Sequence, residues 1–313
     1  MKPEILLLKA IYEPTIAALE RAFVVHKLWR AADAKAFIAE VAPDVRVVVT
    51  NTTRGFARDE FAQFPKLELL ACFGPYVELI DLSAASARNI VVTCTPDSTA
   101  EPVADLAMGL IVAVMRRISE ADRFIRAGKW VDGVFPSGRE VHGKSLGIVG
   151  FGRIGRELAK RAAGFDMTIG YHGPRRKSDV AYRYYDDLHA MAQEVDCLAV
   201  TCPLTDATRN LIDARILQAL GPEGYLVNVA RGPVVDESAL VQALSNGTIA
   251  GAGLDVFRDE PRVPPELMRM DHVVLAPHMG TSTREIREER SRKLLADLDA
   301  FFAGRAPTYA VRM

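Results

Sequence analysis

Over its first hundred residues the chain alternates short apolar runs with longer stretches of mixed polarity. A short apolar run bounded by polar residues is typical of a buried strand, whereas apolar residues spaced three and four apart are typical of a helix. Residues 15–22 have the helical spacing. Strand-like runs cover residues 5–8, 23–28, 45–50, 67–73 and 90–93. Alternation of these two kinds of segment predicts a small parallel α/β domain over roughly residues 1–98.

The next stretch, residues 99–129, keeps apolar residues at helical spacing and continues without a glycine-proline break to Gly128. The periodic positions are Val103, Leu106, Leu110, Val114 and Ile118. This pattern predicts one long helix that crosses between two domains. Its apolar faces fit either a contact with a second subunit or burial inside the one chain.

Strand-like and helix-like segments alternate again from residue 145 onward. Strands are expected at residues 145–149, 167–171, 197–201, 225–229, 252–256 and 273–276. Repeated strand-helix units predict a doubly wound parallel sheet, whose functional residues belong at the carboxyl ends of the strands. Residues 283–313 are expected to form a terminal helix and a tail that returns to the first domain.

Three glycines, Gly150, Gly152 and Gly155, form a G-x-G-x-x-G motif between the strand at 145–149 and a helix that starts at Arg153. In a dinucleotide site the first glycine permits the tight turn, the second lets a pyrophosphate approach the backbone, and the third lets the helix pack on the strand. The N–H groups and the positive dipole end of the helix then face the anion. A structural glycine turn is the alternative, and the position between strand and helix favours the dinucleotide.

A basic cluster stands where the adenosine ribose would be read, about twenty residues after the first glycine. An acidic side chain there would accept both ribose hydroxyls and repel a 2′-phosphate. The chain instead has His172, Gly173, Pro174, Arg175, Arg176 and Lys177. Because guanidinium groups bind phosphate through two hydrogen bonds, the cluster favours NADP(H), with NAD(H) still possible. A solvated basic turn is the alternative interpretation.

The composition narrows the class of protein. With 313 residues, 49% of them hydrophobic and 25% charged, the chain suits two globular domains, and a net charge of −1 gives no support for nucleic-acid or membrane-surface binding. The N-terminus is too briefly apolar for a signal peptide, and residues 103–115 are too short to span a bilayer, so a cytoplasmic location is expected. The four cysteines have no C-x-x-C spacing, and no metal site is expected.

Three residues with useful chemistry follow predicted strands: Arg231, Glu260 and His278. Reduction of a 2-oxo acid needs an anchor for the carboxylate, a hydride donor and an acid near the carbonyl oxygen. Arginine can hold a carboxylate in a two-pronged grip, histidine can supply a proton near neutral pH, and a neighbouring carboxylate would raise the histidine pKa. Taken singly, each has another interpretation: Arg231 could form an ion pair on a turn, Glu260 could be a surface acid, and His278 could be a capping or core histidine.

Four motifs resemble those of the D-isomer-specific 2-hydroxyacid dehydrogenases and occur in the family's order. They are Gly150-Phe-Gly-Arg-Ile-Gly155, Asn228-Val-Ala-Arg-Gly-Pro-Val-Val-Asp236, Gly253-Leu-Asp-Val-Phe257 with Glu260-Pro261, and Ala276-Pro-His-Met-Gly280. The resemblance implies that Arg231 binds the substrate, that His278 is the general acid/base and that Glu260 is its partner. Implied cofactor contacts are Arg153, Ile154, Cys202, Pro203, Thr208, Val229, Ala230, Asp255 and Gly280.

The resemblance also implies an organisation. A Rossmann dinucleotide-binding domain would cover residues 99–285, and a smaller, flavodoxin-like α/β substrate domain would combine residues 1–98 with 286–313. A homodimer is implied as well. The expected substrate contacts are Gly74, Pro75, Tyr76, Val77, Arg231 and His278.

One loop departs from the family pattern. Where members usually have Gly-Val-Gly-Tyr-Asp, a loop whose amides hold the substrate carboxylate, this chain has Gly74, Pro75, Tyr76, Val77 and Glu78. Tyr76 replaces the second glycine, and Pro75 has no N–H to donate. Ala100 also stands where many members have a threonine.

Within the family, residues 126–130 and 171–176 are most similar to NADPH-dependent glyoxylate and hydroxypyruvate reductases. The expected activity is therefore NADPH-dependent reduction of small 2-oxo acids to D-2-hydroxy acids. Reduction of hydroxyphenylpyruvate or of a broad range of 2-oxo acids is the alternative. A third class, corepressors that sense the dinucleotide, resembles the same family but carries an acidic ribose reader and long disordered tails, and this chain has neither.

Overall fold

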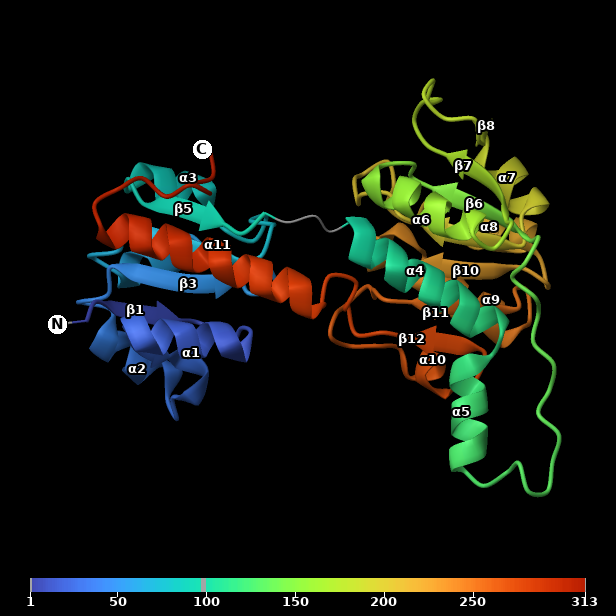
Figure 1. The fold of residues 1–313 in the computed structure, drawn as a ribbon, viewed down its shortest axis with the longest axis horizontal. Helices are drawn as coiled ribbons and strands as arrows, with labels where there is room; N and C mark the ends of the chain where they lie inside the picture. Colours follow the sequence, from blue (N-terminus) through green and yellow to red (C-terminus); the bar gives the residue numbers. More distant parts are fainter. Residues whose placement is uncertain (1, 97–99, 313) are drawn as a thin grey trace. The chain divides into compact units, whose positions relative to one another are not determined.

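The computed structural model describes residues 2–96 and 100–312 and divides into two compact units. The first unit consists of Met1–Ser98 and Thr283–Met313, and the second of Thr99–Ser282. Each unit is a parallel sheet with helices on both faces (Figure 1). No helix among the described residues has the length and apolar composition that crossing a membrane requires.

The first unit contains a five-stranded sheet in the order β2-β1-β3-β4-β5, and all its strand pairs are parallel. The strands are β1 (Glu4–Leu7), β2 (Val24–Lys27), β3 (Val47–Asn51), β4 (Leu69–Phe73) and β5 (Val91–Cys94). This strand order is flavodoxin-like, as expected. Its central strands β3 and β4 are almost fully buried and mostly apolar, because both of their faces are covered.

Helices α1 and α11 cover one face of this sheet, and α2, α3 and the turn η2 cover the other. Their bounds, with that of the remaining 3-10 turn, are α1 (Glu13–Ala22), η1 (Leu28–Arg30), α2 (Ala34–Val41), η2 (Glu60–Gln63), α3 (Leu82–Ala87) and α11 (Arg284–Phe302). The tail after α11 is tied back to its helix, because Asp297 accepts hydrogen bonds from the backbone N–H groups of Thr308 (2.7 Å) and Tyr309 (3.2 Å).

The second unit contains a seven-stranded parallel sheet in the order β12-β11-β10-β9-β6-β7-β8. The strands are β6 (Ser145–Val149), β7 (Thr168–His172), β8 (Arg183–Tyr185), β9 (Cys197–Val200), β10 (Tyr225–Asn228), β11 (Gly251–Leu254) and β12 (Val273–Leu275). The strand order reverses between β6 and β9, which is where ligands bind in doubly wound sheets. The predicted Rossmann fold is confirmed, and the short edge strand β8 is an addition that the apolar pattern did not predict.

Helices α4 and α6 pack on one face of this sheet, and α7, α8 and α9 on the other. The helices and the 3-10 turn of the unit are α4 (Ala100–Met115), α5 (Ile118–Arg126), α6 (Arg153–Ala163), α7 (Leu188–Glu194), α8 (Ala214–Leu220), η3 (Gly232–Val234), α9 (Glu237–Ser245) and α10 (Pro265–Arg269). Aspartates at the N-caps of α7, α8 and α9 each accept two backbone N–H groups, which satisfies donors that a helix start leaves unpaired.

The prediction of one continuous helix over residues 99–129 is wrong. Within the described residues the stretch forms two helices, α4 and α5, and both belong to the second unit, so no helix crosses between domains. Arg117 separates them in the left-handed backbone conformation, at φ 57°, through which a right-handed helix cannot continue. The apolar spacing persists across this break, but Ile118 is 51% exposed whereas Val114 is buried. An extended segment then leads from α5 back to β6 (Figure 1).

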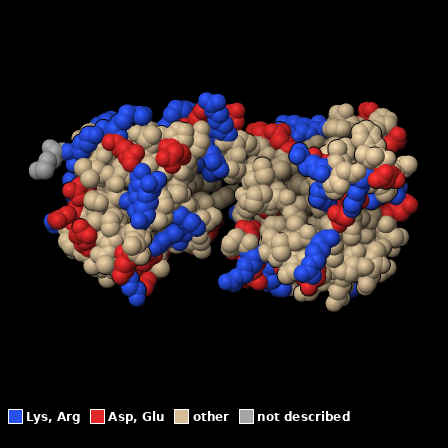
Figure 2. Space-filling model, turned by 90° about the horizontal axis from the view of Figure 1, so that it is seen from below, with Lys and Arg blue, Asp and Glu red and all other residues tan. Residues whose placement is uncertain are grey.

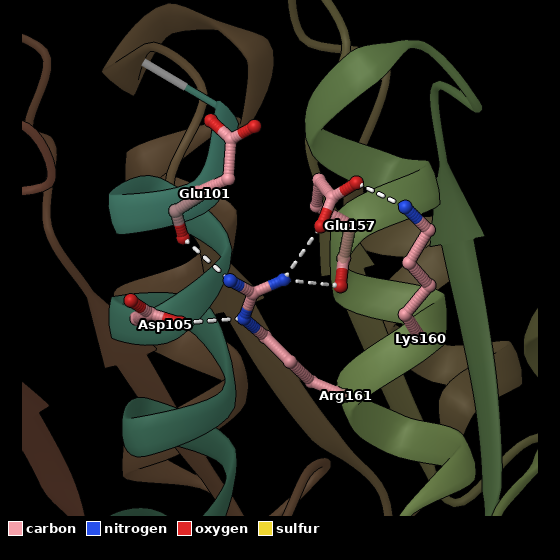
Figure 3. Close-up of polar contacts among 5 residues, drawn as sticks. All are labelled: Glu101, Asp105, Glu157, Lys160 and Arg161. Atoms are coloured by element: carbon pink, nitrogen blue, oxygen red, sulfur yellow. Dashed lines mark hydrogen bonds and ion pairs between the residues drawn. The ribbon is translucent and has the colours of Figure 1, made fainter. Parts of the chain in front are cut away.

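Arg161 clamps α6 to α4 (Figure 3). Its Nε donates to Asp105 at 2.5 Å, its Nη1 to the Glu157 carboxylate at 3.0 Å, and its Nη2 to the Glu101 carbonyl oxygen at 3.2 Å. The guanidinium therefore joins the helix that starts at the glycine motif to the first two turns of α4. Elsewhere, basic and acidic side chains are interspersed over the face that Figure 2 shows.

Candidate active site

The glycine motif forms a tight turn from β6 into α6. Gly150 has φ 93°, and a Cβ there would lie 2.5 Å from the Cα of Cys202, so only glycine fits. A Cβ at Gly155 would lie 2.6 Å from the Gly150 carbonyl oxygen, which explains the close packing of helix on turn. At Gly152, by contrast, a Cβ would meet nothing within 4 Å, and this N-cap has no side-chain cap. The turn thus leaves open space in front of uncapped helix N–H groups, which suits a pyrophosphate.

The basic cluster follows β7 as an exposed loop. His172 is half-buried, with Nδ1 3.0 Å from the carbonyl oxygen of Tyr185 on β8. Arg175 and Arg176 are exposed, and neither makes a hydrogen bond or ion pair within the part of the chain that the structure describes. Arg153, at the start of α6, is exposed too. These cations are available to an anionic ligand.

The loop after β9 is held in shape by hydrogen bonds to the hydroxyl group of Thr208. Thr208 Oγ1 donates to the Pro203 carbonyl oxygen at 2.7 Å and accepts from the Thr205 N–H at 2.7 Å. Cys202 is buried against Gly150, while Pro203 is exposed. The predicted contacts Cys202, Pro203 and Thr208 therefore lie on one ordered loop next to the glycine turn. Val229 and Ala230 are buried on the neighbouring loop after β10.

The turn that carries Arg231 is held by Asn228, the last residue of β10. The Asn228 side chain is buried, accepts from the Ala230 N–H at 3.0 Å and donates to the Arg231 carbonyl oxygen at 3.2 Å. Arg231 itself is half-buried, and its Nη1 donates to the Ala230 carbonyl oxygen at 2.8 Å. Asn228 was part of a quoted motif but was not predicted as a site residue, because a backbone-binding role leaves no signal beyond its place at a strand end.

His278 and Glu260 form the predicted pair. Nδ1 of His278 lies 2.6 Å from Oε2 of Glu260, and Oε1 of Glu260 accepts from the Phe257 N–H at 3.0 Å. The hydrogen bond to Glu260 raises the pKa of His278, and the nearby positive charge of Arg231 opposes that rise. Burial opposes ionisation of Glu260, but its hydrogen bonds with His278 and the Phe257 N–H outweigh burial and lower the pKa of Glu260, with a smaller contribution from the Arg231 charge. All three groups therefore act on one another, with the His278 side chain still 43% exposed.

Asp255, at the end of β11, shapes the loop on which His278 stands. It accepts three consecutive backbone N–H groups: His278 on its carbonyl oxygen (2.9 Å), Met279 on Oδ1 (2.7 Å) and Gly280 on Oδ2 (2.9 Å). Asp255 is 2% exposed, and burial raises its pKa. These bonds hold His278 in its unusual backbone conformation, φ 51°. The two predicted cofactor contacts in this loop, Asp255 and Gly280, are therefore joined by a hydrogen bond.

The remaining predicted substrate contacts lie in the first unit, where the chain leaves β4. Gly74 has φ 153°, and its carbonyl oxygen accepts from the Thr95 N–H at 2.9 Å. The Cys72 thiol donates to the Tyr76 carbonyl oxygen at 3.3 Å. Pro75 and Val77 are half-buried, while the Tyr76 side chain is 40% exposed. Among the described residues, no group of three or more metal-binding side chains is found.

Comparison with known proteins identifies the family. Residues 108–280, more than half of the chain, match the model of the D-isomer specific 2-hydroxyacid dehydrogenase NAD binding domain. The chain belongs to this family. As a D-2-hydroxyacid dehydrogenase it is an oxidoreductase that binds a nicotinamide dinucleotide in its second unit.

Relatives match nearly the whole of this dehydrogenase. Glyoxylate/hydroxypyruvate reductase A of Arabidopsis thaliana is 42% identical, and hydroxyphenylpyruvate reductase of Plectranthus scutellarioides 40%, each over 92% of both chains. An NADPH-dependent glyoxylate/hydroxypyruvate reductase of Sinorhizobium meliloti, solved with NADP and malonate, is 37% identical with a TM-score of 0.82 and covers 99% of this chain and 97% of its own.

Proposed function

We propose that this dehydrogenase reduces small 2-oxo acids, glyoxylate and hydroxypyruvate in particular, to D-2-hydroxy acids with NADPH. The observation that carries the proposal is the 2.6 Å contact between His278 and Glu260 at strand ends, under the influence of the Arg231 charge. The relatives named above support the substrate class. The test is a panel of 2-oxo acids, each assayed with NADPH and with NADH.

The chemistry of the chain's own groups fits a reductase. A reduced nicotinamide, when bound, supplies the hydride to the carbonyl carbon. Arg231 would hold the substrate carboxylate and polarise the carbonyl. Because Nδ1 of His278 is engaged by Glu260, Nε2 is the nitrogen left to give a proton to the carbonyl oxygen. One hydride and one proton complete the hydroxy acid.

We propose that NADP(H) is preferred and that NAD(H) is accepted more weakly. Residues His172, Arg175 and Arg176 would surround the ribose 2′-phosphate, while Gly150, Gly152, Arg153, Ile154 and Gly155 would hold the pyrophosphate. Cys202, Pro203, Thr208, Val229 and Ala230 would line the rest of the cofactor groove, with Asp255 and Gly280 at the nicotinamide end. Arg175 and Arg176, which make no ion pair with any residue that the structure describes, support this preference.

The Glu260→Gln variant should shift the pH dependence of reduction. Glu260 raises the pKa of His278, so the protonated histidine persists to higher pH, and activity falls as the pH rises through that raised value. Without the carboxylate the fall should move to lower pH. The pH profile of kcat/KM, measured where chemistry limits the rate, tests this. An unchanged profile would remove Glu260 from the mechanism.

Tyr76 is proposed to limit substrate size. It adds bulk to the loop that, by the family resemblance, is expected to hold the carboxylate, and this bulk favours hydroxypyruvate over 4-hydroxyphenylpyruvate. Tyr76→Gly should shift the ratio of their kcat/KM values toward the aromatic acid by about ten- to two-hundredfold, the range for a methylene-sized contact. Because the Plectranthus relative is a hydroxyphenylpyruvate reductase, the aromatic acid is the second candidate substrate. A parental ratio below one that Tyr76→Gly leaves unmoved would defeat both the preference and the role of Tyr76.

We propose a homodimer that acts in the cytoplasm. Five large apolar side chains on α5 and the segment after it are more than half exposed, an unusual concentration for a monomer surface. They are Ile118, Ile125, Trp130, Val131 and Val134. The four free cysteines fit a reducing compartment. Light scattering should give a dimer at micromolar concentration, and Ile118→Glu with Ile125→Glu should weaken it. A parental monomer would reject the proposal.

A further inference from the structure

We propose that Tyr171 and Tyr184 position the loop of residues 173–177 for the 2′-phosphate of NADPH, and so help to set cofactor preference. The inference rests on the proposed use of NADPH. Neither tyrosine would touch the phosphate. Each acts through the loop backbone, on either side of Arg175 and Arg176, and is therefore a positioning residue.

The two hydroxyl groups hold the two ends of the loop. The Tyr171 hydroxyl accepts from the Lys177 N–H at 2.7 Å, and the Tyr184 hydroxyl donates to the Gly173 carbonyl oxygen at 3.0 Å. The Tyr171 side chain is 1% exposed, and its ring packs 5.3 Å from that of Tyr184. The buried ring of Tyr171 is a rigid support, and the half-buried ring of Tyr184 packs against it, so each hydroxyl fixes its end of the loop to the sheet.

A third contact, between Arg156 and Asp179, pairs an acidic side chain that follows the loop. Asp179 lies two residues after the loop in the sequence and carries a negative charge. Two nitrogens of Arg156 on α6 bind its two carboxylate oxygens, at 3.0 and 2.9 Å, and lower its pKa. Arg156 in turn lies over the ring of Phe151, which packs 4.6 Å from Tyr171. The negative charge nearest the loop in sequence is therefore already balanced by Arg156 and not by Arg175 or Arg176.

Holding both ends of the loop matters because of entropy. A free loop of this length would have to become ordered when the phosphate binds, and that loss of freedom would weaken binding. With residues 173 and 177 already tied down, most of the ordering precedes binding. NADH has no 2′-phosphate and gains little from the loop. The two tyrosine hydroxyls should therefore affect the two cofactors unequally.

The test compares Tyr171→Phe, Tyr184→Phe and the double variant with Tyr182→Phe. Tyr182 packs edge to face with Phe151 in the same cluster, and its hydroxyl has no hydrogen bond among the described residues, so it is a matched control. Titration calorimetry with adenosine 2′,5′-bisphosphate and with 5′-AMP reports on the phosphate directly. Each single variant should weaken binding of the bisphosphate by about two- to tenfold, the range for one neutral hydrogen bond, and the double variant more. Binding of 5′-AMP should change less.

Steady-state kinetics give a second readout: KM for NADPH should rise more than KM for NADH, with kcat little altered. Equal losses for both nucleotides would show a purely structural role and overturn the inference, as would unchanged binding of the bisphosphate. Should Tyr171→Phe fail to fold, the half-buried Tyr184→Phe decides alone. A parent that binds the bisphosphate no more tightly than 5′-AMP would instead defeat the proposed use of NADPH.

Discussion

Replacing His278 by alanine is expected to lower kcat for 2-oxo acid reduction by about 10²- to 10⁴-fold, the usual contribution of a general acid. KM should change much less, because the variant keeps Arg231, which we propose as the anchor of the carboxylate. The histidine is prepared for this role in two ways: Asp255 fixes its backbone, and Glu260 engages Nδ1 and raises its pKa. Without the imidazole, only water is left to protonate the carbonyl oxygen.

The measurement is the steady-state rate of NADPH oxidation with hydroxypyruvate, at a pH below the parental fall in activity. His142→Ala is the control, since that side chain is 73% exposed and stands before the second-unit sheet begins. It should keep parental kcat. If His278→Ala retained parental kcat and its pH dependence, another group would have to be the acid.

Much of the fold could be predicted because buried parallel strands leave an unambiguous pattern. The run at residues 145–149 is β6, and the helix expected from Arg153 is α6. What the pattern could not predict was a break without glycine or proline. Arg117 turns the chain by adopting a backbone conformation that any residue can adopt at some cost, and its sequence neighbours gave no sign of it.

Within the site, side chains that carry chemistry were easier to predict than those that hold the backbone. Glu260 and His278 stood out because charged groups at strand ends are expected to act, and the structure brings them to 2.6 Å. Asn228 and Tyr171 act on backbone N–H and C=O groups, and such partners depend on how loops fold. Asp255 shows the same limit, since its three backbone contacts became visible only with the loop in place.

Arg231 and His278 each stand on a backbone segment that is held by a neighbouring side chain for which we propose no chemical step. Asn228 holds the turn of Arg231, and Asp255 holds the loop of His278. The tyrosines stand in the same relation to the basic loop. Because the charges and the supports of the loop are different residues, the effect of removing its charges can be measured separately from the effect of loosening its backbone.

Arg175→Ala combined with Arg176→Ala is therefore expected to remove the preference for NADPH outright. A lost hydrogen bond to a charged group costs about 1.5 to 3 kcal/mol, and these side chains are exposed, so the lower figure applies to each. Two such losses amount to about 3 kcal/mol, or about a hundredfold in the ratio of KM for NADPH to KM for NADH. KM for NADH itself should change little.

The control for this experiment must separate the loss of two positive charges in general from their loss at this particular loop. Arg21→Ala with Arg305→Ala removes the same net charge from exposed sites of the first unit and should leave the ratio unchanged. Raising the ionic strength should weaken NADPH binding in the parent but hardly in the loop variant, because salt screens exposed ion pairs. Equal increases in KM for both cofactors would mean that the loop supports the fold of the site without binding the 2′-phosphate.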